Sequence, residues 1–471
     1  MVDVQSPGSA GWWLARLGRR LDDRRARYDL LDRYFRGDHR LPEGDDRCRD
    51  MFRRFQRKAR TNYVGLVAES VRERLHPVGF RTGGASSGDV DDEAWRIWQA
   101  NYLDADSGLV HLAALVFSDA YVCVGANPND DRTPVITPED PREVIVETDP
   151  VNRRLVRAGL KLWTDDLDKT RHAVLYLPDK IHYFSSRADE TNTGLDRYGE
   201  RAWEVEQDPR DNAIGAVPLV RFVNRPTLSN DGLGEFEDLL DVQDRINNTV
   251  LDRLVISKLQ AYRQRWVKNI PTEDEDGNPL DLPFVPGVDL LWAVDAPEAG
   301  EPEAAFGEFE QVNLTPLLEA VKEDRQALVM LSGLPPHYVA GDLINASEAA
   351  MAAAETRLVA KVRERMRHFG ESWEAVIRLA FRYVGDDART DSEMLWADPE
   401  RKTDAQLADA ADKKMTAGVP WHQRMVDLHY SPQEIKRMES DRASDALHAA
   451  LAAPLNGQPE RNGQASGRPA A

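Results

Sequence analysis

The stretch NIPTEDEDGNPLDLPFVPGVDLLWAVDAPEAGEPEAAFGEFEQV, from Asn269 to Val312, lies between two segments with helical periodicity. It is rich in proline, glycine and acidic residues, and residues 269–321 contain 13 Asp and Glu but no Lys or Arg. Asp276-Gly277 and Pro286-Gly287 are turn signals, and residues 288–294 have the composition of a short strand. The stretch therefore predicts a polar insert without a visible core of its own.

The segments on either side of the insert predict two helices. Residues 235–262 carry apolar side chains at helical spacing, and Thr315-Pro316 fits an N-cap followed by proline at the first helical position of a helix that ends near Leu331. Neither segment is apolar on all faces, so neither is expected to be buried within a monomer. The exposed faces favour neighbouring copies, as in a cyclic head-to-tail assembly.

The chain before this helical pair predicts a helical start and a β-rich middle. Helical patterns cover residues 16–36 and 62–76, a short segment with Trp95 and Trp98, and a segment from about Ser107 with Asp106 as its N-cap. Short runs rich in β-branched and aromatic residues between 121 and 223 predict mainly antiparallel strands, separated by turns that include residues 208–212.

The chain after the pair is predicted to be helical. A long helix is expected over residues 346–384, where Asn345 and Glu348 have capping-box spacing, and further helices over residues 404–417 and 431–450. The last residues, 451–471, have the composition of a disordered tail. The sequence as a whole predicts an α+β protein that is mainly α.

Composition limits the class of protein. The chain has 471 residues, of which 41% are hydrophobic and 30% charged, as in soluble globular proteins. Cys48 and Cys123 are too few for a metal cluster or a disulfide framework. The most apolar run, residues 109–124, is interrupted by polar residues, and no secretory signal is recognised. We therefore expect a protein that works or assembles inside a cell, without a membrane partner.

The net charge of −20 is unevenly distributed. Residues 16–81 contain 19 Lys and Arg against 11 Asp and Glu, an excess of +8 that leaves −28 for the rest of the chain. Such asymmetry indicates separate surfaces with different partners. Solvated helix faces are the favoured interpretation of the basic stretch, and a grip on DNA is the alternative.

Motifs for catalysis are missing from the sequence. It contains no phosphate-binding loop, dinucleotide fingerprint or nucleophile elbow, and its ten histidines are scattered. Residues 273–278 superficially match a calcium loop, but Thr272 and Pro283 would stand where carboxylates are needed. Asp165-Asp166-Leu167-Asp168 is interpreted as a turn. We expect no catalytic residue, no metal site and no cofactor.

Several motifs, in this order, resemble the portal proteins of long-tailed phages of the siphophage type found in actinobacterial viruses. GLGEFEDLLDVQDRINN (232–248) is similar to the entry of that family's stem helix, and LSGLPP (331–336) to the break after the second stem helix. Gly341-Asp342 and NASEAAM (345–351) are similar to the opening of its long helix, and AGVPW (417–421) to a connection in its C-terminal unit. Leu233 and Ala346 stand where Ser and Gly are common.

The resemblance implies a portal fold and a structural role. Twelve copies would form a ring at one capsid vertex, in the virion, after assembly in the host cytoplasm. Partners would be the terminase large subunit, the head–tail adaptor, the major capsid and scaffolding proteins, and double-stranded DNA passing non-specifically through the channel. The implied regions are a wing (1–231, β-rich over 121–223), stem helices (232–263 and 312–333), a clip (264–311), a tunnel loop with the long helix (334–385), a crown (386–450) and a tail (451–471).

The resemblance also assigns candidate functional residues. The tunnel loop near DNA would be Gly341, Asp342, Leu343, Ile344 and Asn345. Acids that repel phosphate and line the channel would be Glu235, Asp238, Asp241 and Asp244. Lys361 and Arg365 would contact phosphate or pair with neighbouring acids, and the second interpretation is favoured. The docking surface of the clip would include Trp266, Asp274, Asp276, Asp289 and Trp292.

Two other functions stay open at the level of the sequence. One is a DNA-processing enzyme that uses carboxylate-bound Mg²⁺, and the other is a ring-forming adaptor protein that is not viral. The enzyme requires carboxylates that converge on a metal ion, whereas the acidic clusters in the sequence have the spacing of turns.

Overall fold

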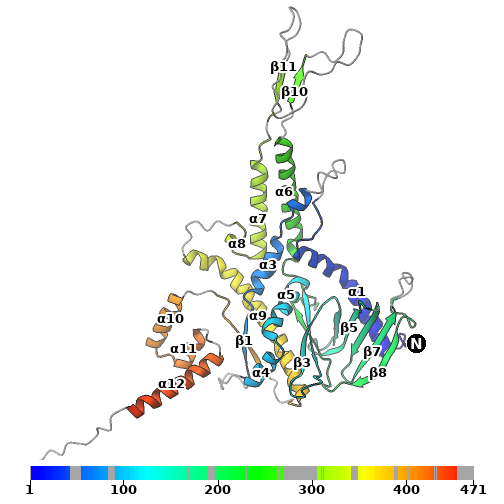
Figure 1. Ribbon diagram of the computed structural model, residues 1–471, viewed down its shortest axis with the longest axis vertical. Helices are drawn as coiled ribbons and strands as arrows, with labels where there is room; N and C mark the ends of the chain where they lie inside the picture. The colour runs from blue at the N-terminus through cyan, green and yellow to red at the C-terminus, as the bar shows by residue number, and fades with distance from the viewer. Residues whose placement is uncertain are drawn as a thin grey trace, which may run out of the picture.

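Polar side chains begin the N-terminal helices in the computed structural model (Figure 1). Ser9 caps α1 (Ala10–Phe35), Asn62 caps α3 (Tyr63–Arg72) and Asp91 caps α4 (Asp92–Ala100), each by accepting a hydrogen bond from a backbone N–H of the first turn. Helix α5 (Leu103–Phe117) instead begins after Tyr102, which has a left-handed backbone. The predicted N-cap at Asp106 is therefore wrong, because Asp106 lies inside the first turn.

The structure describes most of the chain. The described residues are 2–42, 55–82, 91–167, 169–187, 197–229, 231–261, 265–269, 305–308, 310, 312–340, 348–386, 391–400, 404–428, 430 and 432–452.

The β-rich middle is antiparallel, as predicted, and it forms two sheets. One has the order β3-β2-β9 and the other the order β4-β5-β6-β7-β8. Their strands are β2 (Asp119–Gly125), β3 (Val135–Glu139), β4 (Val144–Thr148), β5 (Val156–Thr164), β6 (Thr170–Tyr176), β7 (Lys180–Arg187), β8 (Glu204–Asp211) and β9 (Leu219–Val223). The predicted turn over residues 208–212 is mostly strand. Because β8 is an exposed edge strand, Pro209 fits there without breaking a sheet interior.

A further pair of strands joins distant parts of the chain. β1 (Pro77–Arg81) pairs antiparallel with β12 (Glu393–Trp396), and Arg81 forms an ion pair with Glu393 across the pair. Neither strand was predicted from the sequence, because each is short and its partner lies more than three hundred residues away.

Helix α9 (Glu348–Val384) passes through the largest core, close to its predicted bounds. Trp373 on this helix is fully buried, and its ring contacts Trp98 and Phe222 edge-on, each at a centroid distance of 4.8 Å. A second core forms where α1 packs on the five-stranded sheet, through Leu14, Leu17 and Leu21. Helix α1 therefore packs on the five-stranded sheet, whereas α9 packs against β2 and β9 of the three-stranded sheet.

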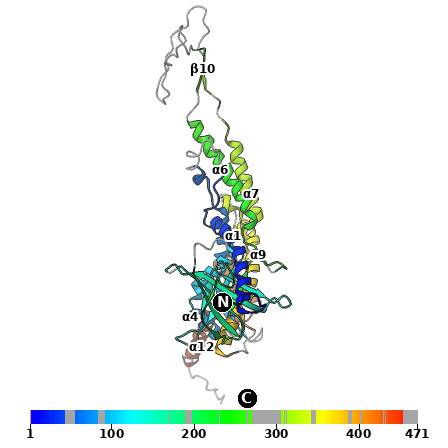
Figure 2. The ribbon, with the colours of Figure 1, turned by 90° about the vertical axis from the view of Figure 1, so that its right-hand side faces the viewer.

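The predicted helical pair projects from the body as a hairpin (Figures 1 and 2). A short 3₁₀ turn, η2 (Glu237–Leu239), leads into α6 (Leu240–Ala261), and α7 (Thr315–Ser332) returns beside it, with Pro316 in its first turn. The N-cap of α7 is Leu314, one residue before the predicted N-cap Thr315. Val242, Ile246 and Val250 of α6 pack with Val321 and Leu328 of α7.

At the far end of the hairpin, β10 (Arg265–Lys268) pairs antiparallel with β11 (Ala305–Glu308), so the insert starts as a two-stranded ribbon. The turns and the strand predicted within residues 270–304 lie outside the described residues. The remaining described helices are α10 (Asp404–Thr416) and α12 (Pro432–Ala452), which were predicted, and α8 (Pro336–Ala340) and α11 (Trp421–Asp427), which were not. Among the described helices, none is both long and apolar enough to cross a membrane.

His111 of α5 lies in the main core and predicts a pH dependence. Its Nε2 accepts a hydrogen bond from Trp373 Nε1 (2.9 Å), and complete burial lowers its pKa from 6.5 to about 3. Between these values the unfolded chain binds a proton that the folded chain does not bind. We therefore expect His111 to reduce stability as the pH falls below 6.5, by at most about 1.4 kcal/mol per pH unit.

Urea unfolding at several pH values measures this effect. His111→Gln removes the titrating group while keeping an acceptor, so the variant should show a shallower loss of stability between pH 6.5 and 4. An unchanged slope would mean that His111 does not contribute.

Candidate functional site

The segment Gly232–Glu237 joins the hairpin to the body through its backbone. Gly232 lies against the carbonyl oxygens of Ser118 and Asn224, where an added Cβ would stand at 2.6 and 2.9 Å. The backbone N–H of Glu235 donates to the carbonyl of Leu115 (2.7 Å). The glycines of the GLGEF motif are thus required by close backbone contacts at the end of α5.

A Gly232→Ala variant should destabilise the chain by about 1–3 kcal/mol, because the methyl group would overlap backbone atoms that cannot rotate away. Thermal unfolding measures the change. Gly108→Ala is the control, because an added Cβ at Gly108 would meet only an arginine side chain at 3.9 Å. Gly8 also has open space around it, but its positive φ would add strain in an alanine variant. Gly108→Ala should therefore be neutral or stabilising, and an equal loss in both variants would contradict the steric argument.

Charged side chains reinforce the same segment. Arg27 of α1 donates two hydrogen bonds to the carboxylate of Glu237 (2.7 and 2.6 Å) and one to the carbonyl of Gly232 (3.1 Å). Glu237 in turn accepts from the N–H of Gly234 (3.0 Å). These contacts connect α1 to the start of the hairpin.

A row of cations on α9 binds the two chain segments at the base of the hairpin, which are the entry to α6 and the C-terminal end of α7. Arg357, Lys361 and Arg365 are four residues apart and therefore share one face of the helix. Arg357 donates to the carbonyl of Met330 (2.5 Å) and Lys361 to that of Ser332, so both cations stabilise the C-terminal end of α7. We call these three residues the α9 clamp.

The other end of the α9 clamp binds Glu235, at the entry to α6. Lys361 Nζ lies 2.8 Å from Glu235 Oε1, and Arg365 Nε lies 3.1 Å from Oε2. The side chains of Glu235 and Arg365 are 1% and 4% exposed. Burial by itself would raise the pKa of Glu235, but the charges and hydrogen bonds of Lys361 and Arg365 outweigh it and lower the pKa.

A cavity of about 140 Å³ adjoins the α9 clamp. Its lining includes Glu235, Lys361 and Arg365 together with Asp238, which forms an exposed ion pair with Arg225 (2.7 Å). The charges that surround it largely compensate one another. The arrangement therefore provides mechanical connection between α9 and the hairpin rather than an open site for a charged ligand.

These positions correct two predictions. Glu235 cannot line a channel, because its carboxylate is buried and bound by two cations of its own chain. Arg365 cannot contact phosphate for the same reason, and Lys361 is held by Glu235 and by the end of α7. The favoured interpretation of Lys361 and Arg365, pairing with acids, agrees with this geometry. Arg357 was missed, although its spacing from Lys361 and Arg365 was visible in the sequence.

The other predicted acids lie along α6 and just before it. Asp238 and Asp241 are exposed, and Asp244 is half-buried and accepts a hydrogen bond from the hydroxyl of Tyr34 (2.7 Å). The predicted tunnel loop, residues 341–345, lies outside the described residues. So do Asp274, Asp276, Asp289 and Trp292 of the predicted docking surface, while Trp266 lies in β10.

Several arginines of the basic N-terminal stretch are bound to acids of the body. Arg24 of α1 and Arg221 of β9 pair with buried Asp119 (3.5 and 2.6 Å), which also accepts from the hydroxyl of Tyr28 (2.9 Å). Arg16 lies 3.0 Å from Glu147. These pairs favour the interpretation of α1 as an internal support rather than a grip on DNA.

In the part of the chain that the structure describes, carboxylates do not converge as a metal-dependent nuclease would require. Within the described ranges, no group of three or more His, Cys, Asp and Glu is placed to hold a metal ion. Asp165 and Asp166 lie in the turn between β5 and β6, where Asp165 Oδ1 accepts from the N–H of Leu167 (2.8 Å).

Comparison with known proteins places this architecture in context. The family model described as "Phage portal protein, SPP1 Gp6-like" matches residues 14–446. The chain is 30% identical over 421 residues to the portal protein of Mycobacterium phage L5, which covers 85% of this chain and 81% of that protein. It is 29% identical over 413 residues to the portal protein of Mycobacterium phage D29, and this match covers 83% of this chain and 80% of that protein.

Proposed function

Since the chain belongs to the SPP1 Gp6-like family of phage portal proteins, we propose that twelve copies form the ring at its capsid vertex. A portal protein is a structural component of the phage head, not an enzyme, and double-stranded DNA is packaged and ejected through its channel. The observation that supports this role best is the α6–α7 hairpin. It projects from the body and is clamped at its base to the longest helix (Figures 1 and 2).

The regions of the chain receive roles in this ring. The body up to residue 231 is the wing, the α6–α7 hairpin is the stem, and residues 264–311 are the clip. Residues 341–345 form the tunnel loop that approaches DNA, α9 supports it, and residues 386–450 form the crown. The α9 clamp supports this assignment, because it would transmit a displacement of α9 to both stem helices.

The partners follow from these roles. The acidic clip, with Trp266, Asp274, Asp276, Asp289 and Trp292, docks the terminase large subunit during packaging and the head–tail adaptor afterwards. The wing contacts the major capsid and scaffolding proteins. The ring assembles in the host cytoplasm and remains in the virion.

Asp238, Asp241 and Asp244 are the acids that we propose for the channel surface. Their negative charge repels DNA phosphates, so DNA can move without being held. Asp241 is the most informative of them, because its carboxylate is exposed and lies at the start of the stem.

The Asp241→Arg ring should bind double-stranded DNA at low salt more tightly than the wild-type ring. The slope of log K against log salt concentration should steepen by about 0.9 for each new phosphate contact. Asp208→Arg, an equal charge reversal on the exposed edge strand β8, serves as the control. Fluorescence anisotropy of a DNA duplex at several salt concentrations measures both. Equal slopes for the two variants would exclude Asp241 from the channel surface.

The ring is tested on the purified full-length chain. Native mass spectrometry should give an assembly of about twelve times the single-chain mass of 53.1 kDa, and negative-stain images should show closed rings. A persistent monomer that cleaves DNA in the presence of Mg²⁺ would overturn the proposal and favour the enzyme.

A further inference from the structure

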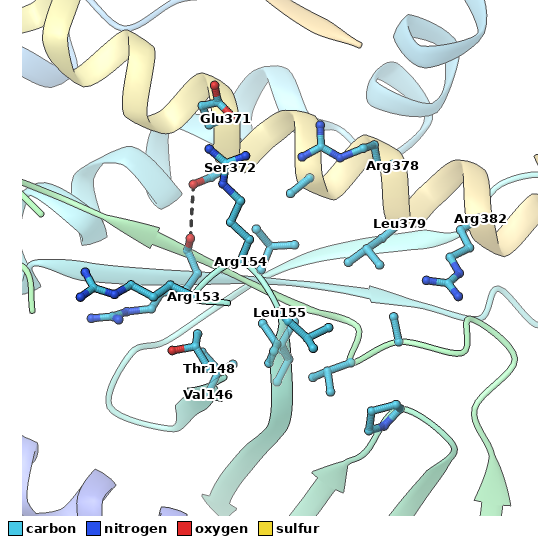
Figure 3. A pocket seen from close by; sticks show the side chains of 18 of the residues that line it. Val146, Thr148, Arg153, Arg154, Leu155, Glu371, Ser372, Arg378, Leu379 and Arg382 are labelled. Atoms are coloured by element: carbon cyan, nitrogen blue, oxygen red, sulfur yellow. Dashed lines mark hydrogen bonds between the residues drawn. The ribbon is translucent and has the colours of Figure 1, made fainter. Parts of the chain in front are cut away.

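A groove of about 970 Å³ lies between the last turns of α9 and the β4–β5 turn (Figure 3). Its apolar part includes Leu155 and Leu379, and Leu155 is 54% exposed. The size is that of a site for a ligand or a short peptide segment. On α9 the groove begins at Glu371, six residues after Arg365 of the α9 clamp, and no residue lines both this groove and the small cavity at the base of the hairpin.

Positive charge dominates the groove. Five arginines and two acids line it, and one of the arginines, Arg221, is already paired with Asp119. Figure 3 shows Arg378 and Arg382 on α9 and Arg153 and Arg154 on the turn, with the side chain of Arg154 directed toward α9. Arg153 and Arg154 are exposed, and Arg378 is half-buried. In a chain of net charge −20, such a surface favours a partner segment that is acidic and carries an apolar side chain.

The β5–β6 turn of the same chain has this chemistry. Its sequence is Asp165-Asp166-Leu167-Asp168, and the side chain of Asp166 is 98% exposed, although it lies 3.5 Å from Lys169 Nζ of the same turn. Leu167 is 95% exposed, although it is a large aliphatic residue. The hydrogen bond from the N–H of Leu167 to Asp165 Oδ1 holds the turn in shape, so little conformational entropy would be lost when it docks.

The turn and the groove lie at opposite ends of β5. Arg153, Arg154 and Leu155 immediately precede the strand (Val156–Thr164) and the acidic turn follows it. Nine residues of strand span about 30 Å, so the turn cannot reach the groove of its own chain. In Figure 2 the turns of the sheet project to both sides of the narrow body, whereas the hairpin runs along its length. Complementary surfaces that face opposite ways are what a head-to-tail ring requires.

We propose that the β5–β6 turn of one copy inserts into the arginine-lined groove of the next copy in the ring. Leu167 packs against Leu155 and Leu379, and Asp165 and Asp166 face Arg154 and Arg378. The proposal rests on the ring of the proposed function and names a surface that closes it. The occupant is a second copy of this chain, because both halves of the contact are present once in each copy.

Cysteine cross-linking tests the contact directly. Leu167→Cys and Leu379→Cys are introduced together in a Cys48→Ser background, in which the remaining Cys123 is buried. A disulfide needs Cβ atoms about 3.5–4.5 Å apart, which the span of β5 prevents within one chain. Oxidation should therefore produce a ladder of covalent oligomers up to the ring. Leu167→Cys alone, under the same treatment, should not produce the ladder.

Charge reversal provides a second test that does not depend on a cysteine. Asp166→Arg and Arg154→Glu each place like charges in the contact, and both positions are exposed, so the variants should fold normally. We expect each variant to need at least about tenfold more protein for half-assembly, and the combined variant to recover most of the loss. Asp208→Arg on β8 is the control and should assemble like the wild type.

The outcomes separate this inference from the proposed function. If wild-type rings form, but the double-cysteine chain stays monomeric on denaturing gels and both charge variants assemble normally, the docking of the turn is wrong. If the wild-type chain forms no ring at all, the proposed function itself fails.

Discussion

Replacing Glu235 with glutamine should lower the free energy of unfolding of the chain by about 3–5 kcal/mol. The substitution keeps the shape of the side chain but removes the charge that Lys361 and Arg365 share in the interior. Lys361 would then lose its carboxylate partner, and Arg365 would keep only Glu364, which lies 2.9 Å from its Nη1. The uncompensated charge, with little water around it, accounts for most of the loss. Urea unfolding at pH 7, followed by tryptophan fluorescence, measures it.

Asp238→Asn is the matched control for this prediction. Asp238 lines the same small cavity and pairs with Arg225 at 2.7 Å, but its side chain is 59% exposed. An exposed ion pair contributes about 0–1 kcal/mol, so the control should be nearly neutral. Similar losses in the two variants would show that burial of Glu235 does not set the size of the effect.

The same carboxylate predicts how the loss depends on pH. The pKa of Glu235 is lowered in the folded chain, so its ionised form contributes stability above the unfolded pKa of about 4.5. That contribution is lost as the pH falls through the folded pKa. The difference between wild type and Glu235→Gln should therefore be constant near pH 7 and shrink below about pH 4.5. A difference that grows on acidification would contradict this sign.

Replacing Trp373 with alanine should cost about 3–5 kcal/mol. Trp373 is fully buried at the centre of the main core, where it contacts Trp98 and Phe222 and donates a hydrogen bond to His111. The change leaves a large cavity and also removes the donor to His111, so both effects act in the same direction. Thermal and urea unfolding of the variant measure the loss.

Trp373→Phe separates the two contributions. It retains most of the aromatic volume but lacks the indole N–H, so the loss should be clearly smaller than for alanine. If phenylalanine is as destabilising as alanine, the hydrogen bond to His111 rather than the cavity dominates. Ring assembly by the folded fraction should be unchanged in both variants, because Trp373 does not reach the surface.

The elements that the sequence predicted well depend on neighbours a few residues apart. Helices α6, α7 and α9 follow from apolar residues that recur every three or four positions, and the sheets follow from short β-branched runs bounded by turns. The family also followed from ordered local motifs. GLGEF and LSGLPP are recognisable because close backbone contact and a helix end each require particular residues at fixed positions.

The predictions that failed depend on partners far away in the chain. Glu235 was expected on a channel surface because helical spacing shows which residues share a face, but not which face becomes buried. Its partners, Lys361 and Arg365, lie more than a hundred residues later. The pairing of β1 with β12 was missed for the same reason, because nothing in the local sequence of either short strand indicates its partner.

For the same reason, the arginine-lined groove could not be predicted. Arg154 and Arg378 belong to a turn and a helix that are separated by more than two hundred residues, and packing of α9 on the sheets brings them together. Sequence patterns establish the helices, the strands and the family, because these depend on local spacing. Which charges are buried, paired or presented to a neighbouring copy depends on the packing of distant surfaces, where removal of water sets the strength of each interaction.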